Sequence, residues 1–288
     1  MEQEPASTQV NDTKLVHTLL FLYQRMEDMM LAVECLKSLE NSTYQTVVIY
    51  NQGILSNEAL KVFVAPFHLN CHIIGDGVNV GTAVGRQKCF EYIWEHMPDT
   101  AYISELHLDM LFTRNWEDAL VQYLEHNDEP LVCCGIVNKE GHLPFLDKTV
   151  TLPDTRGQYI DFLELQRTDS IVHGFTNPCI HASEILKKAG GYNADFLKGR
   201  HCFEDDSMLL GYYYYYGTQR DWHPKVNYNS VVFHSVAGQR MAVQGKVSVN
   251  YEGLVKQYGL MGLKALSTLH SSAWHKRFFW DRYQEGIR

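Results

Sequence analysis

The stretch Glu105-Leu106-His107-Leu108-Asp109-Met110 follows a short apolar run at residues 101–104 and precedes a predicted helix start at Asn115. It therefore marks the end of a predicted strand. On an extended backbone His107 and Asp109 point to the same side, and an imidazole beside a carboxylate supplies two ligands for a divalent ion. Open α/β proteins bind ligands at the carboxyl ends of their strands. The stretch indicates either such a binding edge or an ordinary strand end with polar residues.

Strands and helices alternate on both sides of this stretch. Apolar runs predict strands at residues 15–23, 47–50, 71–74, 101–106, 131–137 and 231–233. Helical spacing predicts helices at residues 26–36, 57–64, 116–124, 183–189 and 204–216, and a long helix after residue 81. Alternation of this kind favours an α/β fold with a mostly parallel central sheet flanked by helices.

The pattern also predicts how the 288 residues are divided. Residues 1–13 are polar and aperiodic, which predicts a flexible tail. Residues 14–240 are predicted to form one domain, in which the irregular residues 139–175 are expected to face a substrate. Residues 241–288 are predicted to form a small C-terminal helical extension. Its basic and aromatic segment, residues 275–280, is expected to pack on the domain, although it could also touch a membrane surface.

Composition excludes some classes of function. The net charge is −9, from 25 basic and 34 acidic residues, which argues against a nucleic-acid partner. The seven cysteines form no C-x-x-C pair and lie mostly in apolar runs, as expected of buried thiols in a reducing compartment. We see no signal peptide and no apolar run long enough to cross a bilayer. These features predict a soluble, cytoplasmic protein.

Two further segments carry residues suited to binding or catalysis. Residues 79–87, N-V-G-T-A-V-G-R-Q, open a helix, where backbone N–H groups attract anions and small side chains allow close approach. Gly75 and Gly77 begin a dinucleotide-binding motif, but Val80 occupies the position of its third glycine. Phe203-Glu204-Asp205-Asp206 places three carboxylates in a first helical turn. One of them could act as a general base, or all three could be there because the helix dipole stabilises negative charge at this end.

In their order, these segments resemble the family 2 inverting glycosyltransferases of the GT-A fold, over about residues 15–240. Residues 21–39 are similar to the family's T-Y-N-R … C-L-x-S-L, and residues 79–87 to its N-x-G-x-x-x-A-R-N. Counted back from Trp116, His107-Leu108-Asp109 lies in register with the family's aspartate-x-aspartate signature. Residues 190–206 are similar to its G-G-F-D-E-x-F … E-D-x-D.

The resemblance implies roles for individual residues. It implies donor-binding roles for Tyr23, Asn51, Asn79, Gly81, Arg86, Gln87 and His107. It implies metal ligands at Asp109, His107 and His234, a general base at Asp205 with Glu204 and Asp206 next, and acceptor contacts at Thr176 and Asn177.

The sequence departs from the family's pattern at two of these positions. His107 replaces the first aspartate of the metal signature, so Mn²⁺ suits the site at least as well as Mg²⁺. Glu105 could also bind the ion, although it should face the other side of the strand. Asn51 stands where the family has an aspartate that contacts uracil.

The implied activity is that of a hexosyltransferase-like glycosyltransferase. It would transfer a sugar, with inversion, from a nucleoside-diphosphate sugar such as a UDP-sugar to a hydroxyl or similar nucleophile. The acceptor could be a glycan, a lipid-linked sugar, a peptide or a small molecule. Two alternatives are a degenerate relative that binds a sugar nucleotide or glycan without turnover, and a nucleotidyltransferase. The latter expects a glycine-rich basic loop after the first strand, which residues 23–26 do not supply.

Overall fold

The computed structural model describes residues 13–22, 26–218, 221–235 and 247–288. Within these residues one large sheet runs through the molecule in the order β3-β2-β1-β4-β10-β6-β11-β5, and β9 pairs with β11. Its strands are β1 (Leu15–Phe21), β2 (Thr46–Asn51), β3 (Asn70–Ile74), β4 (Tyr102–Leu106), β5 (Met110–Leu111), β6 (Leu131–Asn138), β9 (Ile171–His173), β10 (Cys179–Ala182) and β11 (Lys225–His234).

The sheet is mostly parallel, as predicted. β3, β2, β1 and β4 run parallel to one another, and β6 and β11 are also parallel to each other. The sequence did not predict β10, which lies antiparallel between β4 and β6 and joins these two parallel groups. β11 is also longer than predicted, because the polar residues at its start pair with β9.

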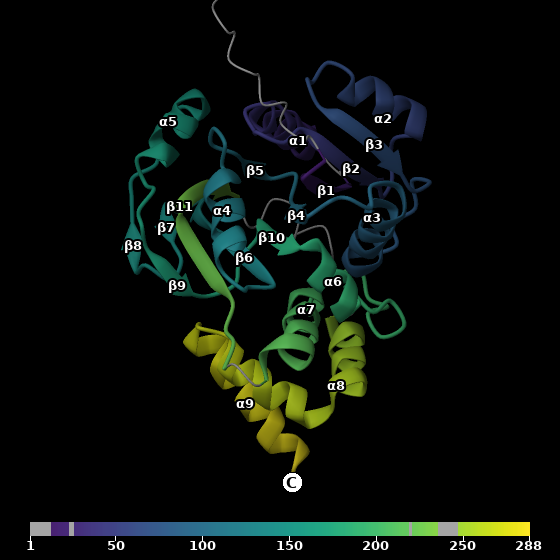
Figure 1. Cartoon of the computed structure of the whole chain (residues 1–288), viewed down its shortest axis with the longest axis vertical. Coiled ribbons are helices and arrows are strands. Elements are labelled where there is room, and N and C mark those ends of the chain that lie inside the picture. Colours follow the sequence, from purple (N-terminus) through teal and green to yellow (C-terminus); the bar gives the residue numbers. More distant parts are fainter. Residues whose placement is uncertain (1–12, 23–25, 219–220, 236–246) are drawn as a thin grey trace, which may run out of the picture.

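Helices cover both faces of the sheet (Figure 1). α1 (Met26–Leu39), α2 (Asn57–Val64) and α4 (Asp118–His126) contribute to one buried cluster with Leu36, Leu60 and Trp116. The other cluster contains Phe90 and Leu209 and is built by α3 (Thr82–His96), α6 (Ser183–Ala189) and α7 (Glu204–Tyr212). The predicted α/β architecture with helices on both faces of the sheet is therefore confirmed.

Local chemistry accounts for several helix ends. The Ser56 hydroxyl accepts a hydrogen bond from the backbone N–H of Ala59 and caps α2. α6 ends at Gly190, whose φ of 92° is easily adopted only by glycine. We predicted one helix from Glu204 to Tyr216, but α7 gives way to a π-helical segment, Tyr213–Gly217.

The C-terminal helices α8 (Val247–Leu269) and α9 (Ala273–Gly286) share a core with the rest of the chain. Leu254, Leu263 and Phe279 belong to the same buried cluster as α7. Phe279 is only 1% exposed, so the basic aromatic segment packs inward there, whereas Trp280 next to it is 44% exposed. Residues 1–12 of the predicted tail (1–13) and the boundary at residue 240 lie outside the described residues, and the division into domains stays a prediction.

The predicted irregular segment after β6 contains short elements of its own. They are the strand pair β7 (His142–Leu143) and β8 (Lys148–Thr149), the turn η1 (Arg156–Gln158), the helix α5 (Tyr159–Glu164), and β9. Arg114 holds α5 through Asp161 and Glu164, at 2.8 and 2.7 Å. The segment leaves the sheet at the end of β6 and pairs with the start of β11 through β9. It then leads into β10, whose first residue, Cys179, lies beside Glu105 near the end of β4.

No helix among the described residues combines the length and the apolar character needed to cross a membrane. The cytoplasmic location stays a prediction.

Candidate functional site

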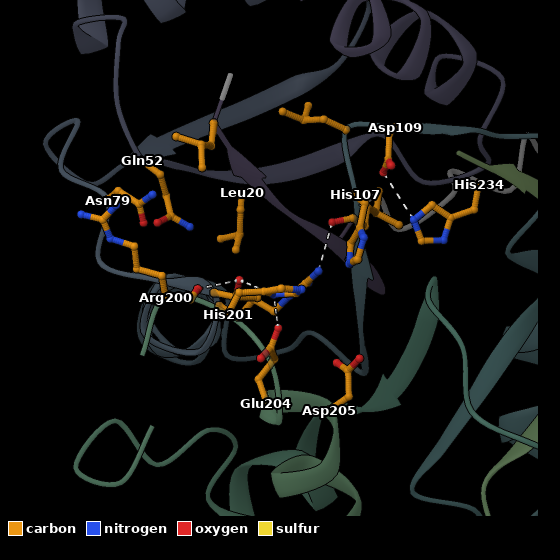
Figure 2. Close-up of a pocket in the computed structure, with 15 residues that line it drawn as sticks. Leu20, Gln52, Asn79, His107, Asp109, Arg200, His201, Glu204, Asp205 and His234 are labelled. Atoms are coloured by element: carbon orange, nitrogen blue, oxygen red, sulfur yellow. Dashed lines mark hydrogen bonds and ion pairs between the residues drawn. The ribbon is translucent and has the colours of Figure 1, made fainter. Parts of the chain in front are cut away.

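A cavity lies at the carboxyl edge of β1, β2 and β4 (Figure 2). Among the residues singled out from the sequence, those that line it are Asn79, Arg86, His107, Asp109, Glu204, Asp205 and His234. The polar residues that line it without having been predicted are Gln52, Thr82, Arg200 and His201. The cavity therefore gathers residues from both halves of the chain.

Strand pairing brings the three predicted metal ligands together. The chain turns after β4 and enters β5, which pairs antiparallel with the end of β11 so that His234 lies opposite Met110. The backbone N–H of Ser235 also donates to the carbonyl of Asp109, at 3.0 Å. As Figure 2 shows, the side chains of Asp109 and His234 point toward each other, with Nε2 3.4 Å from Oδ1.

The donor set of this cluster fits a divalent ion. Ligand atoms of His107, Asp109 and His234 all lie within 4.8 Å of one another. Asp109 and His234 are 5% and 6% exposed, so both are largely shielded from water. Two imidazoles and one carboxylate suit a transition ion such as Mn²⁺, whereas Mg²⁺ favours oxygen ligands. Which ion binds, and whether one binds at all, stays a prediction.

Glu105 faces away from this cluster, as the alternation along a strand predicts. Its carboxylate binds Arg86 at 2.8 Å and His181 Nε2 at 2.8 Å, and it accepts a hydrogen bond from the Tyr192 hydroxyl. Burial raises the pKa of Glu105, but Arg86 and His181 more than offset this and hold it below its usual value. Cys179 and His181 also gather around Glu105, but the contacts with Arg86 and Tyr192 already satisfy this carboxylate. It is therefore not a candidate metal ligand.

Arg86 was predicted to bind the donor, and in the structure its guanidinium binds protein groups. Besides Glu105, it donates to the backbone carbonyl of Leu106, at 3.2 Å. It thereby fixes the end of β4 directly before His107. A buried ion pair of this kind is costly to break from one side, because the remaining charge loses its partner.

The acidic turn at the start of α7 contributes two carboxylates to the cavity. Glu204 and Asp205 line it, and Glu204 is bound by His201 Nδ1 at 2.6 Å. The third predicted carboxylate, Asp206, is not among the lining residues and instead binds His270 Nε2 at 2.7 Å. Asp206 therefore holds the C-terminal helices, and its predicted catalytic role has no support from the cavity.

Burial has the largest effect on the acidity of Asp205. The dipole at the start of a helix favours the charged form of a carboxylate. Even so, burial raises the pKa of Asp205 to about 7, and the negative charges of Glu204 and Glu105 act in the same direction, while Arg86 lowers it. A carboxylate with this pKa is half protonated near neutral pH, which is the range in which a general base works best.

Several predicted donor and acceptor residues lie outside the cavity lining. Asn51 donates to the carbonyl of Leu55 and to Asn57, so it shapes the turn after β2, while its neighbour Gln52 lines the cavity. Gln87 accepts from the backbone N–H of Tyr192, at 2.8 Å. Tyr23 lies outside the described residues.

The two predicted acceptor residues are also absent from the cavity lining. Asn177 is buried, and its side-chain oxygen accepts from the Cys179 thiol, at 3.5 Å. The Thr176 hydroxyl donates to the carbonyl of the adjacent Asn177. A contact of either residue with an acceptor stays a prediction.

Gly81 was expected to approach a nucleotide, but protein backbone fills that position. A Cβ at Gly81 would lie 2.8 Å from the carbonyl oxygen of Gly199. The Gly81 N–H donates to Asn79 and the Thr82 N–H to the Arg200 carbonyl, at 3.0 and 2.9 Å. These two N–H groups are therefore paired within the protein, and a role of Gly81 in donor binding stays a prediction.

This contact predicts the effect of Gly81→Ala. Gly81 has φ 89° and ψ 165°, a conformation that is essentially restricted to glycine and costs alanine about 1–3 kcal/mol, and the clash with Gly199 adds overpacking of about 1–3 kcal/mol. We expect urea unfolding to show a loss of at least about 2 kcal/mol. Gly190→Ala is the control for a positive φ without a clash, because Gly190 has φ 92° and ψ −2° and no atom within 4 Å of an added Cβ. Equal losses in the two variants would contradict the close contact.

The sequence offered little signal for the other cavity residues. Gln52 directly follows a predicted strand, and Arg200 and His201 directly precede the acidic turn, so proximity to recognised segments could have indicated them. Nothing local relates residue 200 to Thr82, whose hydroxyl and N–H both contact the Arg200 carbonyl.

Comparisons with known proteins give a fold but no sequence family. No family model and no curated protein sequence matches the chain. The structure of S. aureus TarS, a glycosyltransferase, matches with a TM-score of 0.56 and 11% identity over 94% of this chain, which spans 43% of TarS. TarS 1–349 matches at 0.51 with 12% identity, covering 94% of this chain and 78% of that one. TarS 1–349 in complex with UDP-GlcNAc matches at 0.50 with 9% identity, covering 89% and 80%.

Sequence identities this low support a common fold and nothing further. The likeness to TarS extends over 94% of this chain. The chain therefore has a GT-A-like glycosyltransferase fold, as its sequence motifs predicted.

Proposed function

We propose that the protein transfers a sugar, with inversion, from a nucleoside-diphosphate sugar to an acceptor hydroxyl or similar nucleophile. One observation carries the proposal: a single cavity contains both the His107, Asp109 and His234 cluster and the carboxylate of Asp205. A divalent ion and a general base are the two groups that such a transfer needs from the protein. The arrangement supports family 2 chemistry, which the fold alone does not establish.

Some residues of the cavity would act on the leaving group and others on the nucleophile. A divalent ion held by Asp109, His107 and His234 would neutralise the charge that develops on the departing diphosphate. Asp205 would accept the proton of the acceptor hydroxyl as its oxygen attacks the anomeric carbon, and its raised pKa suits this at neutral pH. Arg86 keeps the end of β4 in place through Leu106.

A UDP-sugar is the donor that we propose. TarS 1–349, which shares the fold, has been solved in complex with UDP-GlcNAc. In this chain the side-chain amides of Gln52 and Asn79 line the same cavity as the metal cluster. Amides can donate and accept hydrogen bonds, as recognition of a base or a ribose requires.

A thermal-shift panel of sugar nucleotides, with and without manganese, tests the proposal. A ligand at 100 times its Kd stabilises the native state by about 2.7 kcal/mol. We expect UDP-sugars with manganese to raise the Tm more than manganese alone does, and the same samples to release UDP when an acceptor is turned over. If no nucleotide raises the Tm, the proposal is wrong. Stabilisation without donor hydrolysis or transfer would favour the alternative, a protein that binds sugar nucleotides without turnover.

A further inference from the structure

We infer that Asn250 of α8 is a positioning residue for the donor site. It fixes residues 199–203, which form one wall of the cavity and lead into the acidic turn of α7. The inference rests on the proposed function, because it assigns the wall to donor binding. It also makes the C-terminal helices part of the site, whereas the sequence suggested a separate extension.

One buried amide bridges both ends of this wall. Asn250 is 1% exposed. Its Oδ1 accepts from the backbone N–H of Gly199, at 2.5 Å, and its Nδ2 donates to the carbonyl of Cys202, at 2.8 Å. Arg200 and His201, which line the cavity, lie between these two anchor points. Burying an amide is favourable only when its hydrogen bonds are made, so α8 and the wall must fit together closely.

The opposite side of the wall contacts the start of α3. The Thr82 N–H donates to the carbonyl of Arg200, and the missing Cβ of Gly81 leaves room for Gly199. A Cβ at Gly199 would itself lie 2.7 Å from Asn250 Oδ1. The wall is therefore held between α3 and α8, and the close approach of the Gly199 carbonyl leaves no room for a Cβ at position 81.

The wall ends in a turn that needs support from outside. Cys202 and Phe203 both have positive φ, at 80° and 62°, and such conformations of non-glycine residues persist only where surrounding structure holds them. The Phe203 ring contacts Tyr251 of α8 and Phe279 of α9. The next residues are Glu204 and Asp205, so the C-terminal helices also set the position of the proposed base.

The wall presents a positive charge to the cavity. Arg86 is bound to Glu105 and His201 to Glu204, whereas the guanidinium of Arg200 makes no ion pair with any residue that the structure describes. In Figure 2 the Arg200 side chain extends toward Asn79. A guanidinium that is free to bind a ligand suits an anion such as a nucleoside diphosphate.

Calorimetry with UDP and manganese tests the inference on the full chain. In Asn250→Ala we expect the Kd for UDP to rise by about 10- to 100-fold, because a displaced wall loses its alignment with the ligand. Hydrogen exchange at residues 199–203 should accelerate in the same variant, since the Gly199 N–H loses its acceptor. Arg200→Gln should raise the Kd for UDP without faster exchange.

Ser267→Ala is the matched control within α8. Its hydroxyl is largely buried and donates within the helix to Lys264, at 2.7 Å, so the variant should lose stability and keep the wild-type Kd. Should Asn250→Ala fail to fold, Asn250→Asp replaces it: the carboxylate still accepts from Gly199 but cannot donate to Cys202, and the Kd for UDP should again rise.

The outcomes separate this inference from the proposed function. A wild-type protein that binds no UDP overturns the UDP-sugar as donor, and one that binds no nucleotide of the thermal-shift panel overturns the proposed function itself. A wild-type protein that binds UDP, with an unchanged Kd in the folded Asn250 variant, overturns only the role of Asn250. A rise of equal size in Ser267→Ala would also overturn it, because general loosening of α8 would then explain the effect.

Discussion

Asp205→Asn is expected to lower kcat by about 10²–10⁴-fold, the usual contribution of a general base. The amide has nearly the same shape as the carboxylate but cannot accept the proton of the acceptor hydroxyl. The fold and the affinity for the donor should therefore persist. Steady-state rates with a saturating UDP-sugar and acceptor, together with the Kd of the donor from calorimetry, measure the two effects separately.

The acidity of Asp205 adds a pH dependence to this expectation. Burial raises the pKa of Asp205 to about 7, and only the ionised form can accept a proton. The wild-type rate should therefore be low at acidic pH and rise as the pH passes through about 7. Residual activity in Asp205→Asn should lack this rise. A wild-type profile that is flat over this range would show that another group is the base.

The neighbouring carboxylates are the controls. Asp206 binds His270 at 2.7 Å and does not line the cavity, so Asp206→Asn should lose stability and keep its kcat. Glu204 faces the cavity and is bound by His201. A large loss of kcat in Glu204→Gln, with Asp205→Asn near wild type, would move the base one residue upstream.

Asp109→Ala should abolish manganese-dependent binding of the donor. Removing the one carboxylate of the cluster leaves two imidazoles, which hold the ion poorly, and the ion would no longer reach the diphosphate. Calorimetric titration of UDP with and without manganese measures the change. Asp99→Ala removes an exposed carboxylate outside the cavity and should leave binding intact. Unchanged donor affinity in Asp109→Ala would rule out this metal site.

The choice of ion depends on His107. His107→Asp replaces nitrogen by oxygen in the ligand set, so activity should persist while the preference moves from Mn²⁺ toward Mg²⁺. Activity in each metal, measured at equal ionic strength, gives the ratio. A ratio unchanged from wild type would show that His107 does not bind the ion.

Much of the fold could be predicted because β1, β2 and β6 are continuous apolar runs, typical of strands buried on both faces. β10 escaped prediction for the opposite reason. Its four residues include His181, which is fully buried. A buried imidazole is acceptable here only because Glu105 and Tyr212 bind both ring nitrogens. Those partners come from distant parts of the chain, so no local pattern reveals the strand.

The candidate site was likewise predictable from the sequence only in part. His107 and Asp109 follow one strand and His234 ends another, so the rule that ligands gather at the carboxyl edge brought them together correctly. Asn250 lies 51 residues from Gly199, the residue that it binds. No sequence motif marks Asn250, because its proposed role depends on contacts with residues 199–203 that form only when the chain folds. The pairing of Arg86 with Glu105 likewise depends on side-chain geometry.

The pairing of the segment between β6 and β10 has a consequence for how such a protein can change. Residues 139–178 leave the sheet at the end of β6 and lead into β10 at Cys179, which lies beside Glu105 of β4. Between these two points β9 attaches the segment to the start of β11. The strands β1, β2 and β4 pair with one another, with β3 and with β10, but with no residue of this segment. Insertions or deletions between β6 and β9 would therefore leave the pairing of β1, β2 and β4 intact.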